Sequence, residues 1–207
     1  MKMDIPSLEQ TESFINEGRI MSPGPWVQHS FFVAKAAESI AQHHPKLDPT
    51  IAFILGYLHD IGRRVGITDM HHILDGYYFL KEKGFDDAAR ICITHSFPIK
   101  NVYSAAGEWD CTSQELQFVK GYLSNLEFDE YDRLIQLCDA IALPTGFSLI
   151  EKRLMDVALR RGVNGYSVLR WKAYLEIKQD FEKIIGHSIY KTLPGVVENT
   201  FESNLLA

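Results

Sequence analysis

Apolar residues recur at spacings of three and four along most of the chain, which is the periodicity of a helix with one buried face. Alternation of apolar and polar residues with a period of two, bounded by turn residues, is not found. The sequence therefore predicts an all-α protein. The predicted helices cover approximately residues 8–17, 26–43, 49–62, 71–83, 86–95, 112–123, 128–143, 149–161 and 168–185, with a shorter one after residue 194.

Capping residues and helix breakers support these boundaries. Ser7 and Asp48 can cap the helices that follow them, and Thr112 with Glu115 has the pattern of a capping box. Proline and glycine at residues 22–25 and 144–146 interrupt the helical pattern, and residues 99 to about 111 are predicted to be irregular. No repeat, low-complexity tract or linker divides the chain, so we expect a single domain over residues 1–207.

Composition narrows the class of protein. A chain of 207 residues with 46% hydrophobic residues can build one domain with a continuous core. It has no apolar run of 18 residues, and its first 12 residues carry acids and no apolar stretch. We therefore expect a cytoplasmic protein without membrane association. Cys92, Cys111 and Cys138 lack metal or redox spacing, so we expect reduced thiols, two of them in the core.

The net charge of the chain limits the kinds of partner that it can bind. A net charge of −6 argues against polymeric nucleic acid, because such binding depends on clustered lysine and arginine that neutralise phosphates. A small anion could still bind in a local basic pocket. The sequence leaves a homodimer open.

Histidines and acids form a more specific pattern. His59 and Asp60 stand side by side at the end of an apolar helix. The further candidates fall on or beside other predicted helices: His29, His71, His72, His95 and Asp139. Nitrogen and carboxylate ligands from several helices suit a hard or borderline divalent metal ion. The joint pattern predicts a metal site between helices, although a histidine on an apolar face taken singly is more often a hydrogen-bonded core residue.

The order of these residues resembles the HD superfamily of metal-dependent phosphohydrolases, which is named for the His-Asp pair. The resemblance extends from about residue 25 to residue 144, and residues 52–63 are similar to the family's helix that ends in His-Asp-Ile-Gly before a basic residue. It implies an all-α, single-domain helical bundle with a metal-ligand core at about 25–144. The C-terminal helices, about 148–207, are expected to pack on that core.

The resemblance also implies the ligands. Four residues are expected to bind one divalent ion and to leave positions open for water and phosphate oxygens: His29, His59, Asp60 and Asp139. His72 and His95 look like the two additional histidines of dinuclear members, in which Asp60 would bridge two ions. His71 competes with His72, because a helix register predicted from sequence is uncertain by a residue. We expect one or two ions drawn from Fe, Mn, Mg, Co, Ni and Zn.

Positive charge is also needed beside a phosphate. The resemblance places a basic residue at Arg63, which could bind phosphate oxygens and offset the charge of the transition state. Lys100, Arg153 and Arg160 are further candidates.

Simpler interpretations apply elsewhere. Three histidines near helix ends are expected to face solvent: His43, His44 and His187. A solvated face is also the expectation for the charge pairs at residues 152–153 and 160–161. The tryptophans are expected to pack in or beside the core rather than stack on a nucleobase: Trp26, Trp109 and Trp171.

The expected function is metal-dependent hydrolysis of a phosphomonoester, phosphodiester or phosphoanhydride. The expected substrate is a small phosphorylated metabolite, with a nucleotide or dinucleotide as the preferred class. The expected catalytic residues are Asp60, Arg63, His72 and His95, either histidine being a candidate leaving-group acid if one ion binds. Two alternatives stay open: a di-iron oxygenase with the same ligand pattern, and a module that binds metal and nucleotide without turnover.

Overall fold

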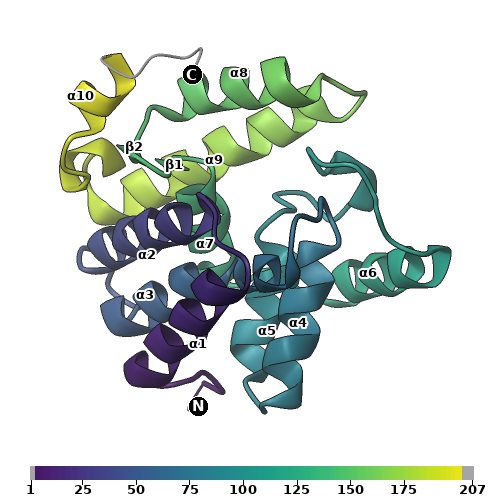
Figure 1. Cartoon of the computed structure of the whole chain (residues 1–207). Helices are drawn as coiled ribbons and strands as arrows, with labels where there is room; N and C mark the ends of the chain where they lie inside the picture. Colours follow the sequence, from purple (N-terminus) through teal and green to yellow (C-terminus); the bar gives the residue numbers. More distant parts are fainter. Residues whose placement is uncertain (1–2, 202–207) are drawn as a thin grey trace.

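The structure, a computed structural model, describes residues 3–201 (Figure 1). Helices dominate it, which confirms the predicted all-α class. The α-helices are α1 (Leu8–Met21), α2 (Trp26–Ala41), α3 (Pro49–Leu58), α4 (His72–Glu82), α5 (Asp86–Thr94), α6 (Ser113–Asn125), α7 (Glu130–Asp139), α8 (Ile150–Arg161), α9 (Ser167–Ile185) and α10 (Val196–Phe201). The short 3-10 helices are η1 (Ile61–Val65), η2 (Val102–Ser104) and η3 (Ile189–Thr192). No helix among the described residues is long and apolar enough to cross a bilayer.

Local sequence explains where several helices begin. The side chains of Ser7 and Thr112 each accept a hydrogen bond from a backbone N–H of the first helical turn, and both form the reciprocal capping box. The Asp48 carboxylate accepts from the backbone N–H groups of Thr50 and Ile51. These caps satisfy N–H groups that have no partner inside the helix.

Two predicted helices end four residues earlier than expected, and the first helix runs to Met21 instead of residue 17. The helix predicted over residues 49–62 ends at Leu58 and continues, after a turn, as η1. The helix predicted to reach residue 143 ends at Asp139, and the next residues form a small antiparallel pair of strands, β1 (Ala142–Leu143) and β2 (Gly146–Phe147). Gly146 adopts φ 142°, a conformation open mainly to glycine, which lets the chain reverse there. Both early ends place an acidic residue at a helix terminus.

The helices are arranged around one large core and a smaller one. Helices α2 and α3 pack together, with α1 and α7 against them, while α4 packs with α5 and η1 (Figure 1). Helix α9 packs on α7 and contributes Tyr174, Ile177 and Phe181 to the same apolar cluster as α2 and α3. A second cluster joins α4 and α5 to α6 and the segment around η2. The single-domain organisation stays a prediction.

Three glycines allow the helices that carry the candidate ligands to approach closely. A Cβ on Gly56 of α3 would lie 2.8 Å from the Cα of Ala34 in α2. A Cβ on Gly62 would lie 1.9 Å from the carbonyl oxygen of His72, and one on Gly76 would lie 2.9 Å from the Sγ of Cys92 in α5. Real Cβ atoms do not approach so closely, so only glycine fits these three contacts.

The expectation for His44 was wrong. Its side chain is buried, and its ring centroid lies 5.6 Å from that of Phe181. The chain turns back after α2 and Leu47 enters the core, which draws His44 under the end of α9. The neighbouring His43 is exposed, as expected. Cys92 and Cys138 are buried and Cys111 is partly buried, all as free thiols.

Candidate metal centre

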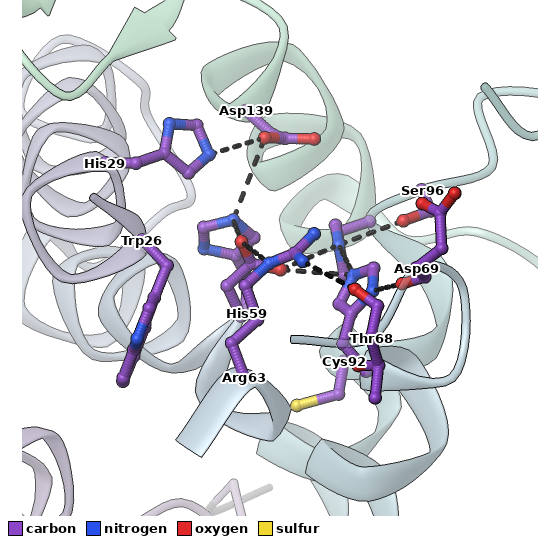
Figure 2. Close-up of polar contacts among 12 residues, drawn as sticks. Trp26, His29, His59, Arg63, Thr68, Asp69, Cys92, Ser96 and Asp139 are labelled. Atoms are coloured by element: carbon purple, nitrogen blue, oxygen red, sulfur yellow. Dashed lines mark hydrogen bonds and ion pairs between the residues drawn. The ribbon is translucent and has the colours of Figure 1, made fainter. Parts of the chain in front are cut away.

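The six predicted ligands meet at one place, where several helix ends converge (Figure 2). They come from five parts of the chain: His29 in the first turn of α2, His59 and Asp60 after α3, His72 at the start of α4, His95 at the end of α5 and Asp139 at the end of α7. Backbone that is leaving a helix lets adjacent side chains turn toward one point. Within a helix, adjacent side chains diverge by about 100°.

One half of the cluster is organised around Asp139. Its Oδ1 lies 2.8 Å from the Nε2 of His29 and 3.7 Å from the Nε2 of His59 (Figure 2). The two imidazole rings stand edge to face, with centroids 5.3 Å apart. These three residues could each direct one ligand atom at a shared metal ion.

The other half is organised around Asp60. Its Oδ1 lies 3.1 Å from the Nε2 of His72 and 3.7 Å from the Nε2 of His95, and its Oδ2 lies 3.8 Å from the Nε2 of His59. His59, Asp60 and His95 form a second group with ligand atoms close enough for one ion. Because His59 belongs to both groups, the cluster is continuous and could hold one ion or two neighbouring ions.

Backbone carbonyls orient three of the imidazoles. The Nδ1 of His59 lies 2.7 Å from the carbonyl oxygen of Gly56, and the Nδ1 of His95 lies 3.1 Å from that of Ile91. The Nδ1 of His72 contacts the carbonyl oxygen of Asp69 in the same way. A carbonyl can only accept, so each Nδ1 carries the proton and each Nε2 offers its lone pair to the cluster. This is the tautomer that a metal ligand needs.

Burial and charge keep the ligands in their binding forms. Burial lowers the pKa of His59, and it lowers the pKa of His95 to about 3, so both rings are neutral near pH 7. Burial raises the pKa of the Asp60 carboxyl, but the positive charge of Arg63, with the contacts to His59 and His72, outweighs burial and brings the pKa well below its ordinary value. The pKa of Asp139 is also lowered, because its contact with His29 outweighs burial.

The donor set fits a divalent metal. Among the described residues, the Nε2 of His59 and the Oδ1 of Asp60 are buried without a hydrogen-bond partner. Buried polar atoms are costly when unpaired, and a cation at the centre of the cluster would satisfy both. Imidazole nitrogens and carboxylate oxygens are ligands for Zn, Fe, Mn, Co and Ni.

The structure separates His72 from its neighbour His71. The Nδ1 of His71 lies 2.8 Å from the Oδ2 of Asp75, and its Nε2 lies 3.4 Å from the Oε1 of Glu115, on the outer side of α4. Helix α4 starts at His72, which points its ring to Asp60 instead. Of the two, only His72 is placed to serve as a ligand.

Arg63 lies beside the cluster and contacts a ligand directly. Its Nε donates to the Oδ2 of Asp60 at 2.7 Å, and its Nη1 donates to the carbonyl oxygen of Thr68 at 3.3 Å. The arginine therefore orients the Asp60 carboxylate and also lines the cleft above the cluster.

A cleft of about 250 Å³ opens above the ligands, and the C-terminal helices form its opposite wall. Helix α8 contributes three arginines: Arg153, Arg160 and Arg161. Arg160 and Arg161 are exposed, as expected, yet they face this cleft. Lys100 does not line the cleft and pairs with Glu127 at 2.7 Å. Trp171, expected beside the core, is half-buried and lines the cleft too.

Sequence reasoning missed Arg170 and Tyr174, which α9 contributes to the cleft. A signal was present: Arg170 shares its helical spacing with Ala173, Tyr174 and Ile177, the buried face of α9. A charged residue on an apolar helix face is unusual, because burial of a charge requires compensation.

Chelation of the metal is expected to destabilise the fold. An ion that binds only the folded chain raises the free energy of unfolding by about 2.7 kcal/mol when its free concentration is a hundred times its dissociation constant. For a chain of this length, that energy corresponds to about 5–10 °C in melting temperature. Thermal unfolding followed by circular dichroism, with chelator and after metal repletion, measures the shift. Identical melting curves for the untreated, the chelator-treated and the metal-repleted protein would contradict a metal site.

Comparison with known proteins agrees with this geometry. The model of the HD domain matches residues 26–143, from just before His29 to just after Asp139. The match contains all six clustered residues and ends before α8. Comparisons with curated proteins and with solved structures found no match. Since the matched region is more than half of the chain, the protein belongs to the HD domain family, a family of metal-dependent phosphohydrolases.

Proposed function

We propose that the protein hydrolyses a phosphate ester or phosphoanhydride bond of a small metabolite, with a nucleotide or dinucleotide as the preferred substrate class. The observation that carries the proposal is the cleft itself. Imidazoles and carboxylates suited to a divalent metal form its floor, and five arginines line it: Arg63, Arg153, Arg160, Arg161 and Arg170. A guanidinium group can donate hydrogen bonds to two phosphate oxygens at once. The combination of a metal centre with several arginines therefore favours a phosphorylated substrate.

A divalent metal held by His29, His59, Asp60 and Asp139, with His72 and His95 for a second ion, would act as a Lewis acid toward a phosphoryl oxygen. The chain's own residues prepare the site for this chemistry. Backbone carbonyls hold the three Nδ1 protons away from the centre. Arg63 keeps Asp60 ionised and oriented, and its remaining guanidinium surface would offset negative charge on the phosphate.

The wall of the cleft supports a nucleotide-like substrate. Trp171 and Tyr174 supply aromatic surface, and Leu154 and Val157 supply aliphatic surface, beside the arginines. A flat base or sugar could pack on this surface while the phosphate meets the metal centre. The segment predicted to be irregular, residues 99 to about 111, adds Ala106 and Gly107 to the same cleft.

The test combines metal analysis with a phosphate-release screen. The purified protein is expected to contain a divalent metal and to release phosphate from at least one of three substrate groups: mononucleotides, dinucleoside polyphosphates and sugar phosphates. Chelation should abolish the release and metal repletion should restore it. The His43→Ala variant serves as the control, because His43 is exposed and outside the cleft, and it should behave as wild type.

Measurements of oxygen uptake and of nucleotide binding, added to this screen, separate the alternatives. Iron in the isolated protein, with oxygen uptake on addition of substrate and no phosphate release, would support a di-iron oxygenase instead. Tight nucleotide binding without release of phosphate by the fully metal-loaded protein would indicate a binding module. Either result would overturn the proposed hydrolysis.

A further inference from the structure

Arg170 is a buried cation without an acidic partner. The residue is only 4% exposed, yet none of the described carboxylates lies within ion-pair distance of its guanidinium. Its Nη1 donates to the carbonyl oxygen of Ser104, which is a neutral group. Burial lowers the pKa of its guanidinium, which is the direction expected where no carboxylate stabilises the charge. A buried charge left in this state is costly unless an anion binds beside it.

Two further arginines, on the wall of the cleft that α8 and α9 form, are only partly neutralised. Arg153 and Arg160 share one carboxylate, that of Asp156, at 2.6 and 2.8 Å. The Nε of Arg153 is buried and has no hydrogen-bond partner among the described residues. Together with Arg170, these side chains carry three positive charges against one negative charge, so a formal charge of two remains. That excess matches a phosphate dianion.

The other two arginines that line the cleft each have a carboxylate partner of their own. Arg161 pairs with Asp69 at 2.8 Å, and Arg63 pairs with Asp60 at 2.7 Å. Each of these carboxylates neutralises its arginine. The excess positive charge therefore lies on the wall formed by α8 and α9, opposite the metal ligands, and not around Arg63.

We propose that Arg170, with Arg153 and Arg160, forms a second anion subsite that binds a non-reacting phosphoryl group of the substrate. This inference rests on the proposed function and narrows it, because a substrate that reaches both the metal centre and this subsite carries at least two phosphoryl groups. A nucleoside polyphosphate or another metabolite with linked or paired phosphates meets this requirement. The subsite lies on helices outside residues 26–143, so it belongs to this chain's C-terminal part and not to the matched family region.

The test measures binding of inorganic pyrophosphate by calorimetry to the full-length, metal-loaded protein, with metal content checked before and after titration. Arg170→Gln is expected to weaken pyrophosphate binding at least tenfold without loss of metal. Arg170→Lys, which keeps the charge, should recover most of the affinity. Lys172→Gln is the matched control: it removes one positive charge from the same helix α9, but Lys172 is exposed and does not line the cleft, so the affinity should change less than threefold.

Melting temperatures of all three variants identify any loss of folding. Equal pyrophosphate affinity in wild type and in a folded Arg170→Gln variant would overturn the subsite, while phosphate release in the substrate screen would leave the proposed hydrolysis standing. Conversely, weaker binding in Arg170→Gln by a protein that hydrolyses nothing would support the subsite and overturn only the catalytic proposal. A loss of affinity as large in Lys172→Gln as in Arg170→Gln would overturn the assignment to Arg170.

Discussion

Replacement of Asp60 by asparagine is expected to remove the bound metal and leave the helical fold in place. Asp60 lies between His59, His72 and His95, and its two oxygens face all three Nε2 atoms. Asparagine has the same shape, but it loses the negative charge and puts an N–H donor where a cation needs a lone pair. Mutation of a residue that only hydrogen-bonds to a metal ligand typically lowers metal affinity about 10–100-fold. Replacement of the ligand Asp60 itself should therefore lower the affinity by at least that factor.

Metal content by elemental analysis, circular dichroism and phosphate release measure the outcome together. Metal and phosphate release should fall in parallel, while the helical signal stays unchanged. His43→Ala is the appropriate control, since His43 is exposed, whereas the buried His44 packs on Phe181 and its removal would itself disturb the core. Full metal content in Asp60→Asn would show that the metal centre has been assigned to the wrong residues.

Replacement of Gly62 by alanine is expected to destabilise both the fold and the metal site. The added methyl group would stand 1.9 Å from the carbonyl oxygen of His72 and 2.5 Å from the backbone nitrogen of Gly76. Both neighbours are backbone atoms, so relief requires η1 to move away from α4. Overpacking in a core typically costs about 1–3 kcal/mol. In a chain of this length, the melting temperature should fall by about 2–12 °C.

Thermal unfolding and metal titration of Gly62→Ala test this expectation. Metal affinity should fall as well, because moving η1 away from α4 would separate Asp60, at the start of η1, from His72 in α4. Gly121→Ala provides the matched control: Gly121 lies inside α6 with no atom within 4 Å of an added Cβ, so alanine should stabilise the helix by up to about 1 kcal/mol. Wild-type stability in Gly62→Ala would mean that η1 and α4 do not pack as closely as described.

Helix positions could be predicted from sequence because their signals are local. Caps such as Ser7 and Thr112 act within one turn, and the apolar spacing of each helix needs no knowledge of its neighbours. The largest errors came at helix ends: α1 runs four residues further than expected, and η1 and the β1–β2 pair replace the expected helix after Leu58 and Asp139. Tertiary packing decides such ends, since the residues beyond them retain ordinary helical periodicity.

The candidate ligands could be predicted because they combine a sequence motif with residue types that a metal requires. The choice between His71 and His72 could not be made, because adjacent residues on a helix differ only in direction. That direction follows from the start of α4 at His72 and from its close contact with Gly62. Arg170 was missed because the sequence does not show that the folded chain brings it to the cleft without a carboxylate partner.

By itself, the sequence determined the helical class and the principal helices, since these depend on periodicity and capping along the chain. The six residues that converge on the candidate centre followed from residue chemistry together with the resemblance to the HD superfamily. The tertiary structure decided which helices and charged residues surround that centre. It placed α8 and α9 above the ligands, left Arg170 without a carboxylate and paired Arg63 with Asp60. The physical reason is that apolar packing fixes how each helix is rotated and docked. Charges distant in sequence therefore become neighbours only in the folded chain.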